Sequence, residues 1–211
     1  MTTSNIEKRS YVGPVEHRAD DGKRTLIGYA AKFERLAMIG SYFQEKIAPG
    51  AFSSAIGGDI RALVDHDPGR VVGRTKSGTL RLSEDGTGLR VEIDLPNTSD
   101  GNDLWELVSR QDISGMSFGF RVTKETWDET GDVPVRTIQA VELFEVSAVA
   151  WPAYEDTTIG LRSLEAARAD GGDREDADRR RAENAAAAAR RIAEKRAAME
   201  QRIRGIRQDA A

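Results

Sequence analysis

Three kinds of side chain in this sequence could together support nucleophilic catalysis: a serine, a histidine and a carboxylate. Ser117 lies in the apolar run 111–120, between Gly115 and Gly119. A serine becomes a nucleophile when a base takes its proton and a third group orients that base. Glycine inside a strand marks a bulge or a close approach, so Ser117 could face a cleft. This stretch taken alone favours a simpler interpretation, a glycine-interrupted core strand with a solvent-facing serine.

His66 is the better placed of the two histidines. It ends an apolar run and lies in the sequence DHDP, where Asp65 and Asp67 favour the imidazolium ion. His17, in VEHRADDG, is expected at a hairpin tip without a chemical role. The sequence has no cysteine, which excludes disulfides, thiolate nucleophiles and cysteine-based zinc sites. It has only two histidines, which argues against a metal site built from several histidines. The remaining arrangement combines Ser117, His66 and an acid.

Glu142 and Glu145 are the candidates for that acid. They are three residues apart in a predicted strand, so we expect them to point to opposite faces of the sheet. One of them can then share a cleft with Ser117, while the other faces solvent or forms a salt bridge. Spacing leaves this choice open, because a catalytic triad is defined by proximity in space.

Charge is distributed unevenly along the chain. Residues 161–211 contain 13 Lys and Arg against 10 Asp and Glu, whereas residues 1–160 contain 18 against 25. An acidic body with a mildly basic tail gives no strong indication of nucleic-acid binding. No apolar run approaches the length of a membrane span, and the polar N-terminus does not have the pattern of a signal peptide.

The elements that must position these residues are mostly short strands. Hydrophobic alternation, interrupted by turn residues at 20–22, 84–88 and 128–132, predicts a mainly β domain of the α+β class: a compact barrel or a strongly curved sheet. The predicted strands are 11–15, 25–33, 42–47, 60–64, 70–75, 79–82, 89–95, the Ser117 strand continuing to about 123, and one within 135–149; the predicted helices are 51–56 and 102–110.

The composition divides the chain into three parts. Residues 1–10 are polar and expected to be loose, residues 11–164 form the domain, and residues 165–211 form a tail rich in Ala, Arg and Glu. A linker is predicted at 170–173. We interpret the tail as a solvated charged helix that is partly disordered. The alternative is a helix that binds a partner or a second copy.

Five segments of the chain carry a resemblance to a known family. They are GYAAKF, IAPGAFSSAI, LVDHDPGRVVGRTKSGTLRLSEDGTGL, GMSFGF and LFEVSAVAWPA, and together they span residues 28–153. In their order and mutual spacing, the chain resembles the prohead (capsid-maturation) proteases of tailed bacteriophages, relatives of the herpesvirus assemblins. The resemblance implies a herpesvirus-protease-like β-barrel with a few flanking helices and a charged helical tail.

The resemblance also implies roles for particular residues. Ser117 corresponds to the nucleophile of a serine endopeptidase and His66 to its base, with Ser114 as the fallback nucleophile. The herpesvirus enzymes use a second histidine as the third member of the catalytic triad, and this sequence has no histidine at the matching position. The phage-type pattern places an acid in LFEVS instead, which favours Glu145 over Glu142. Backbone N–H groups are expected to form the oxyanion hole. No cofactor or metal is implied.

The resemblance finally implies a setting, the procapsid assembling in the host cytoplasm. Such enzymes cut the scaffold, or the scaffold-like part of the major capsid protein, and often themselves. On this reading residues 162–211 form a scaffold-like or targeting segment that self-cleavage removes. Self-association is expected, but no nucleic-acid or membrane partner. The competing hypotheses are a non-catalytic capsid assembly or scaffold-binding protein on the same fold, and a plain β-rich binding module.

Overall fold

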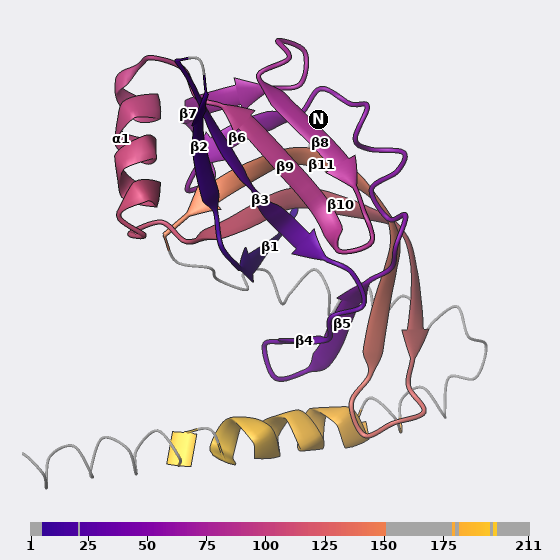
Figure 1. Cartoon of the computed structure of the whole chain (residues 1–211). Helices are drawn as coiled ribbons and strands as arrows, with labels where there is room; N and C mark the ends of the chain where they lie inside the picture. Colours follow the sequence, from indigo (N-terminus) through magenta and orange to yellow (C-terminus); the bar gives the residue numbers. More distant parts are fainter. Residues whose placement is uncertain (1–5, 21, 151–178, 180–181, 195, 198–211) are drawn as a thin grey trace, which may run out of the picture.

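The computed structural model describes residues 6–20, 22–150, 179, 182–194 and 196–197. These residues form two β-sheets, a helix at one end and a second helical stretch within the tail (Figure 1). The strands are β1 (Glu7–Val12), β2 (Glu16–Asp20), β3 (Lys23–Lys32), β4 (Ala37–Ile39), β5 (Phe43–Ile47), β6 (Arg61–Val64), β7 (Asp67–Arg74), β8 (Leu80–Glu84), β9 (Gly88–Asp94), β10 (Gly115–Asp128) and β11 (Val135–Val149), and the helix is α1 (Ser99–Ser109).

The strand β11 organises the larger sheet. This seven-stranded sheet has the order β1-β10-β11-β5-β4. Strand β6 also pairs with β11, near the end of that strand, and β7 pairs with β6. The smaller sheet has four strands in the order β2-β3-β9-β8. Because β11 divides one edge between the short parallel strands β5 and β6, the sheet branches there. Within the described residues neither sheet closes on itself, so the expected barrel is replaced by two open sheets.

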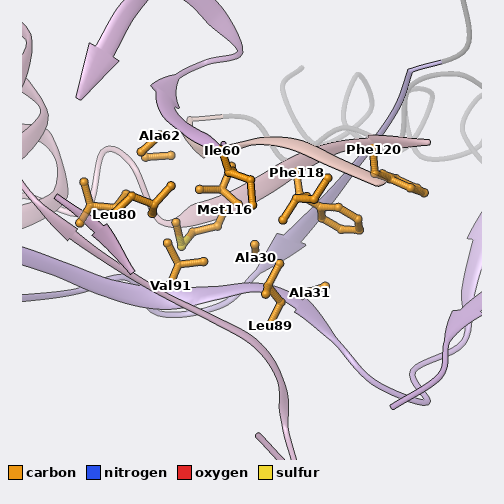
Figure 2. Packing of buried hydrophobic residues seen from close by; sticks show 14 of the residues in the cluster. Ala30, Ala31, Ile60, Ala62, Leu80, Leu89, Val91, Met116, Phe118 and Phe120 are labelled. Carbon is orange, nitrogen blue, oxygen red and sulfur yellow. The ribbon is translucent and has the colours of Figure 1, made fainter. Parts of the chain in front are cut away.

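The hydrophobic core lies between the two sheets. Phe118 of β10 stacks on Phe120 with ring centroids 4.6 Å apart and meets Phe52 edge-on at 5.4 Å. On the facing sheet, the small side chains of Ala30 and Ala31 are buried beside larger aliphatic residues, as Figure 2 shows. Strand alternation therefore turns every second residue of β10 into this core and leaves its other residues on the opposite face.

A network of buried ion pairs joins four strands of the larger sheet. The Arg9 guanidinium contacts Glu45 and Glu7, each at 2.7 Å. The Arg136 guanidinium contacts Glu7 at 2.8 Å, Glu45 at 3.0 Å and Glu125 at 2.6 Å. Burial alone would lower the pKa of Arg136, but its bonds and attraction to these carboxylates outweigh burial and raise it. The network fixes β1 against β5, β10 and β11.

This network explains why residues 7–10, which the sequence analysis expected to be loose, belong to a strand. Strand β1 begins at Glu7, and Glu7 and Arg9 are almost fully buried. Polar composition predicted solvent exposure, but alternate polar residues of β1 point inward and find charged partners far along the chain.

Several other elements differ from the sequence expectation. A separate strand β2 follows β1, and residues 50–57 form successive turns rather than a helix. Residues 182–194 are helical, and Arg191 donates two hydrogen bonds to the Ser41 carbonyl. The linker at 170–173 and the boundary at 164 lie outside the described residues. No helix among those described is long and apolar enough to span a membrane.

The buried network predicts a large stability cost for removing its central cation. Replacing Arg136 with methionine leaves Glu7 and Glu45 buried with less compensating charge. We expect the free energy of unfolding, measured with urea, to fall by about 3–5 kcal/mol. The control Lys46→Met breaks the more exposed pair between Lys46 and Glu34, and we expect a loss below about 1 kcal/mol. Equal losses in the two variants would contradict this account.

Candidate active site

The candidate residues lie on one face of the larger sheet. Phe118 points into the core, so its neighbours Ser117 and Gly119 point away from the smaller sheet. The antiparallel register places Ser117 opposite Ser147 and Gly119 opposite Glu145. Directly opposite residues share a face. We call the face formed by these four residues, turned away from the smaller sheet, the far face.

A β-bulge brings Glu145 to the far face. Gly119 pairs with Glu145, but the next residue of β10, Phe120, pairs with Leu143, so Phe144 is an extra residue in β11. A bulge reverses the alternation of the strand beyond it. Leu143 faces the core before the bulge, and without the extra residue Glu145 would face the core as well.

The bulge also overturns the expectation that Glu142 and Glu145 point to opposite faces. Their partners on β10, Arg121 and Gly119, are two residues apart, so both glutamates belong to the far face. Glu142 lies in an exposed ion pair with Arg121 at 3.1 Å. Glu145 instead contacts His66.

His66 is held in the tight turn between β6 and β7. Asp65 and His66 both have left-handed backbones, with φ of 47° and 60°. Two such residues in succession are what a two-residue hairpin turn requires, and aspartate and histidine tolerate this region better than most residues. The turn is anchored to the end of β11, because the Asp65 N–H donates to Ala148 O at 3.0 Å and the Asp65 carboxylate accepts from the Ala150 N–H at 3.1 Å. Left-handed residues concentrate at functional sites.

The imidazole of His66 is hydrogen bonded to Glu145. The distance from Nδ1 to Glu145 Oε1 is 2.7 Å, and the two side chains are 16% and 13% exposed. The Glu145 carboxylate lies directly over Gly119, where a Cβ atom would be only 2.4 Å from Oε1. The glycine therefore provides the space that the carboxylate needs, as its position in the sequence run indicated.

Ser147 contacts both members of this pair. Its hydroxyl donates to Glu145 Oε2 at 2.6 Å and accepts from the His66 backbone N–H at 3.2 Å. Its side chain is fully buried. Sequence reasoning missed this residue, although a serine two positions after Glu145 on a strand shares its face.

The structure places Ser117 on the far face but not yet in contact with His66. The Ser117 side chain is fully buried, and its hydroxyl donates to the Arg9 carbonyl of β1 at 2.8 Å. Ser114 is exposed in the segment before β10. Of the three candidates, His66 and Glu145 therefore contact each other directly. Ser117 lies on β10, the strand that pairs with the Glu145 strand β11.

The turn carrying His66 lies in a negative electrostatic environment. The pKa of Arg70, on β7, is raised, first by its hydrogen bond to Asp100 and further by attraction from Asp100, Asp65 and Asp67. Within the described part of the chain, no group of three or more His, Asp or Glu side chains could hold a metal ion.

The chain resembles two phage proteins in sequence. It is 31% identical to the prohead protease of Escherichia phage T5 over 99 residues, which are 47% of this chain and 44% of that protein. It is 33% identical to the prohead protease of Enterobacteria phage HK97 over 147 residues, which are 66% of this chain and 60% of that protein. The chain therefore spans about half the length of these curated relatives.

A solved structure supports the fold. The capsid assembly protease of bacteriophage T4 superposes with a TM-score of 0.51 at 12% identity, over 70% of this chain and 98% of that one. At this identity the likeness concerns the fold alone. Residues 13–170, about three quarters of the chain, match the peptidase S78 family, described as caudovirus prohead serine protease. The chain belongs to the caudovirus prohead serine protease family.

Proposed function

We propose that this chain is a serine endopeptidase in which Ser117 is the nucleophile, His66 the general base and Glu145 the group that orients the base. The observation that carries the proposal is the 2.7 Å hydrogen bond between Glu145 and His66 Nδ1, on the sheet face that also bears Ser117. A carboxylate can only accept, so Nδ1 carries the proton of a neutral imidazole and Nε2 keeps its lone pair. This is the tautomer that a general base requires.

The reaction follows from these roles. Nε2 of His66 takes the proton of the Ser117 hydroxyl as Oγ attacks the carbonyl carbon of the scissile peptide bond. The imidazolium then returns this proton to the leaving amine, and the C–N bond breaks to give an acyl-enzyme. Water, deprotonated by the same nitrogen, attacks the ester and releases the new carboxylate while Ser117 recovers its proton. Glu145 stabilises the transient positive charge of His66 throughout.

Ser117 must change its hydrogen bond before it can react. Its hydroxyl donates to the Arg9 carbonyl in the resting structure, so this hydrogen bond has to break before the proton can be directed to His66. Apo enzymes often have loose or misaligned catalytic hydrogen bonds that tighten when substrate binds. Ser117 is favoured over Ser114 because its strand position gives it the same face as Glu145.

The proposed substrates follow from the relatives. Proteins named as prohead proteases and a capsid assembly protease act during capsid formation, so we propose that this chain cleaves scaffold, or the scaffold-like part of the major capsid protein, inside the procapsid. Self-cleavage that removes residues 162–211, and self-association, belong to the same proposal.

The nucleophile can be identified by co-expressing the chain with its capsid protein and recording intact masses. Wild type and Ser114→Ala should produce the same shortened capsid protein, whereas Ser117→Ala should produce none, because removing a triad member costs several orders of magnitude in rate. Unchanged products with Ser117→Ala would refute the assignment. Absence of cleavage in every sample, with the chain bound to assembled capsids, would favour the non-catalytic assembly protein.

Substitutions of the two glutamates form a matched pair of variants that tests which residue is the third member of the triad. Glu145→Gln keeps the size of the side chain but presents an amide to Nδ1, which permits the wrong tautomer. We expect kcat on a peptide spanning the cut site to fall by roughly 10³–10⁴-fold. Glu142→Gln removes only an exposed ion pair and should leave kcat within about twofold. The reverse ranking of the two variants would contradict the assignment.

A substitution at Gly119 tests whether the Glu145 carboxylate needs the space that this glycine leaves. In Gly119→Ala the new methyl group would be 2.4 Å from Glu145 Oε1, so the carboxylate must move away from His66. We expect kcat to fall by about 10- to 100-fold. Gly57→Ala, where no atom lies within 4 Å of the added Cβ, is the control and should retain full activity. Wild-type kcat in Gly119→Ala would show that the position of Glu145 is not critical.

A further inference from the structure

The buried hydroxyl of Ser147 has a fixed hydrogen-bond direction. Its partner on one side is the His66 backbone N–H, at 3.2 Å, which can only donate. Its partner on the other side is Glu145 Oε2, at 2.6 Å, which as a carboxylate oxygen can only accept. The single hydroxyl proton of Ser147 must therefore lie on the Glu145 side.

This direction extends through the carboxylate to the imidazole. With Ser147 donating to Oε2, the other oxygen of Glu145 is directed at His66 Nδ1, at 2.7 Å. Oε1 accepts the Nδ1 proton, and the lone pair then lies on Nε2. A closed ring of contacts results, since Ser147 holds the backbone of His66 while Glu145 holds its side chain.

We infer that Ser147 is a positioning residue for the proposed hydrolytic reaction: it fixes the rotamer of Glu145 and the backbone of the His66 turn, and thereby selects the imidazole tautomer that leaves Nε2 free. The inference rests on the proposed function. It concerns a residue that touches neither the scissile bond nor the nucleophile's proton. In the register of β10 and β11 it lies directly opposite Ser117.

Because the Ser147 hydroxyl is buried, its hydrogen bonds depend on the identity of this side chain. The side chain is fully buried, so water cannot replace it freely when it is removed. Alanine would leave the His66 N–H without its partner and Glu145 Oε2 without a donor, and the carboxylate could then rotate. Threonine retains the hydroxyl and suits a strand. Cysteine keeps the shape but is only a weak donor and acceptor.

The tautomer can be measured directly because the chain has only two histidines. In protein labelled with ¹⁵N-histidine, the nitrogen shifts of His66 distinguish a protonated Nδ1 from an unprotonated one, and His66→Gln assigns them. We expect wild type and Ser147→Thr to show a single tautomer with the proton on Nδ1. Ser147→Ala and Ser147→Cys should show averaged shifts from two exchanging tautomers. His17, which packs on Trp105, should not change in any variant.

Kinetics on the same variants provide the second readout. Ser147→Ala should lower kcat by about 10- to 100-fold with KM within about twofold, since the lost interaction acts on the catalytic base. Ser147→Thr should recover most of this loss. Ser41→Ala removes another buried serine hydroxyl, in the connection between β4 and β5, and controls for a general loss of stability. Its kcat should equal that of wild type.

Unchanged His66 shifts in folded Ser147→Ala and Ser147→Cys would overturn the inference, as would equal losses of kcat in Ser147→Ala and Ser41→Ala. The spectra do not require activity. If Ser117→Ala still cleaves while the spectra change as expected, the nucleophile assignment fails and the positioning role of Ser147 stands. If Ser117→Ala is inactive and the spectra do not change, only the role of Ser147 fails.

Discussion

The hydrogen bond between Glu145 and His66 depends on one extra residue in a strand. Strands alternate their side chains, so Leu143 and Val146, which are three residues apart, can both face the core only if the register shifts between them. The bulge at Phe144 makes that shift and turns Glu145 out of the core, over Gly119 and toward His66. Core packing and site geometry thus impose the same requirement on β11.

The rest of the fold keeps this region of the sheet in place. On one side, β6 runs parallel to the end of β11 and delivers the left-handed turn that carries His66. On the other side, β1 pairs with residues 115–120 of β10, the segment that carries Ser117, and the Arg9 carbonyl accepts the hydrogen bond of the Ser117 hydroxyl. The side chain of Arg9 is fixed in turn by the buried ion-pair network. The resting position of Ser117 is therefore linked to charges far from it in sequence.

Local patterns predicted much of this arrangement. The alternating strands, the helix at α1 and the 135–149 strand are found close to their expected bounds, because each depends on hydrophobic period and turn residues nearby. The sequence did not predict β1 from residue 7, since Glu7 and Arg9 are buried only through partners at 45 and 136. It also missed Ser147 and placed Glu142 and Glu145 on opposite faces, because a bulge is a property of paired strands that one strand does not reveal.

The central claim is that Ser117 is activated by the His66–Glu145 pair, and covalent labelling tests it most directly. A fluorophosphonate reacts only with an activated serine, so the protein should be treated with it during capsid assembly and the adduct mapped by fragmentation of the peptide 111–121, which contains both Ser114 and Ser117. The account predicts one adduct, on Ser117, that disappears in Glu145→Gln. An adduct on Ser114, or one on Ser117 that persists at the same rate without Glu145, would contradict it.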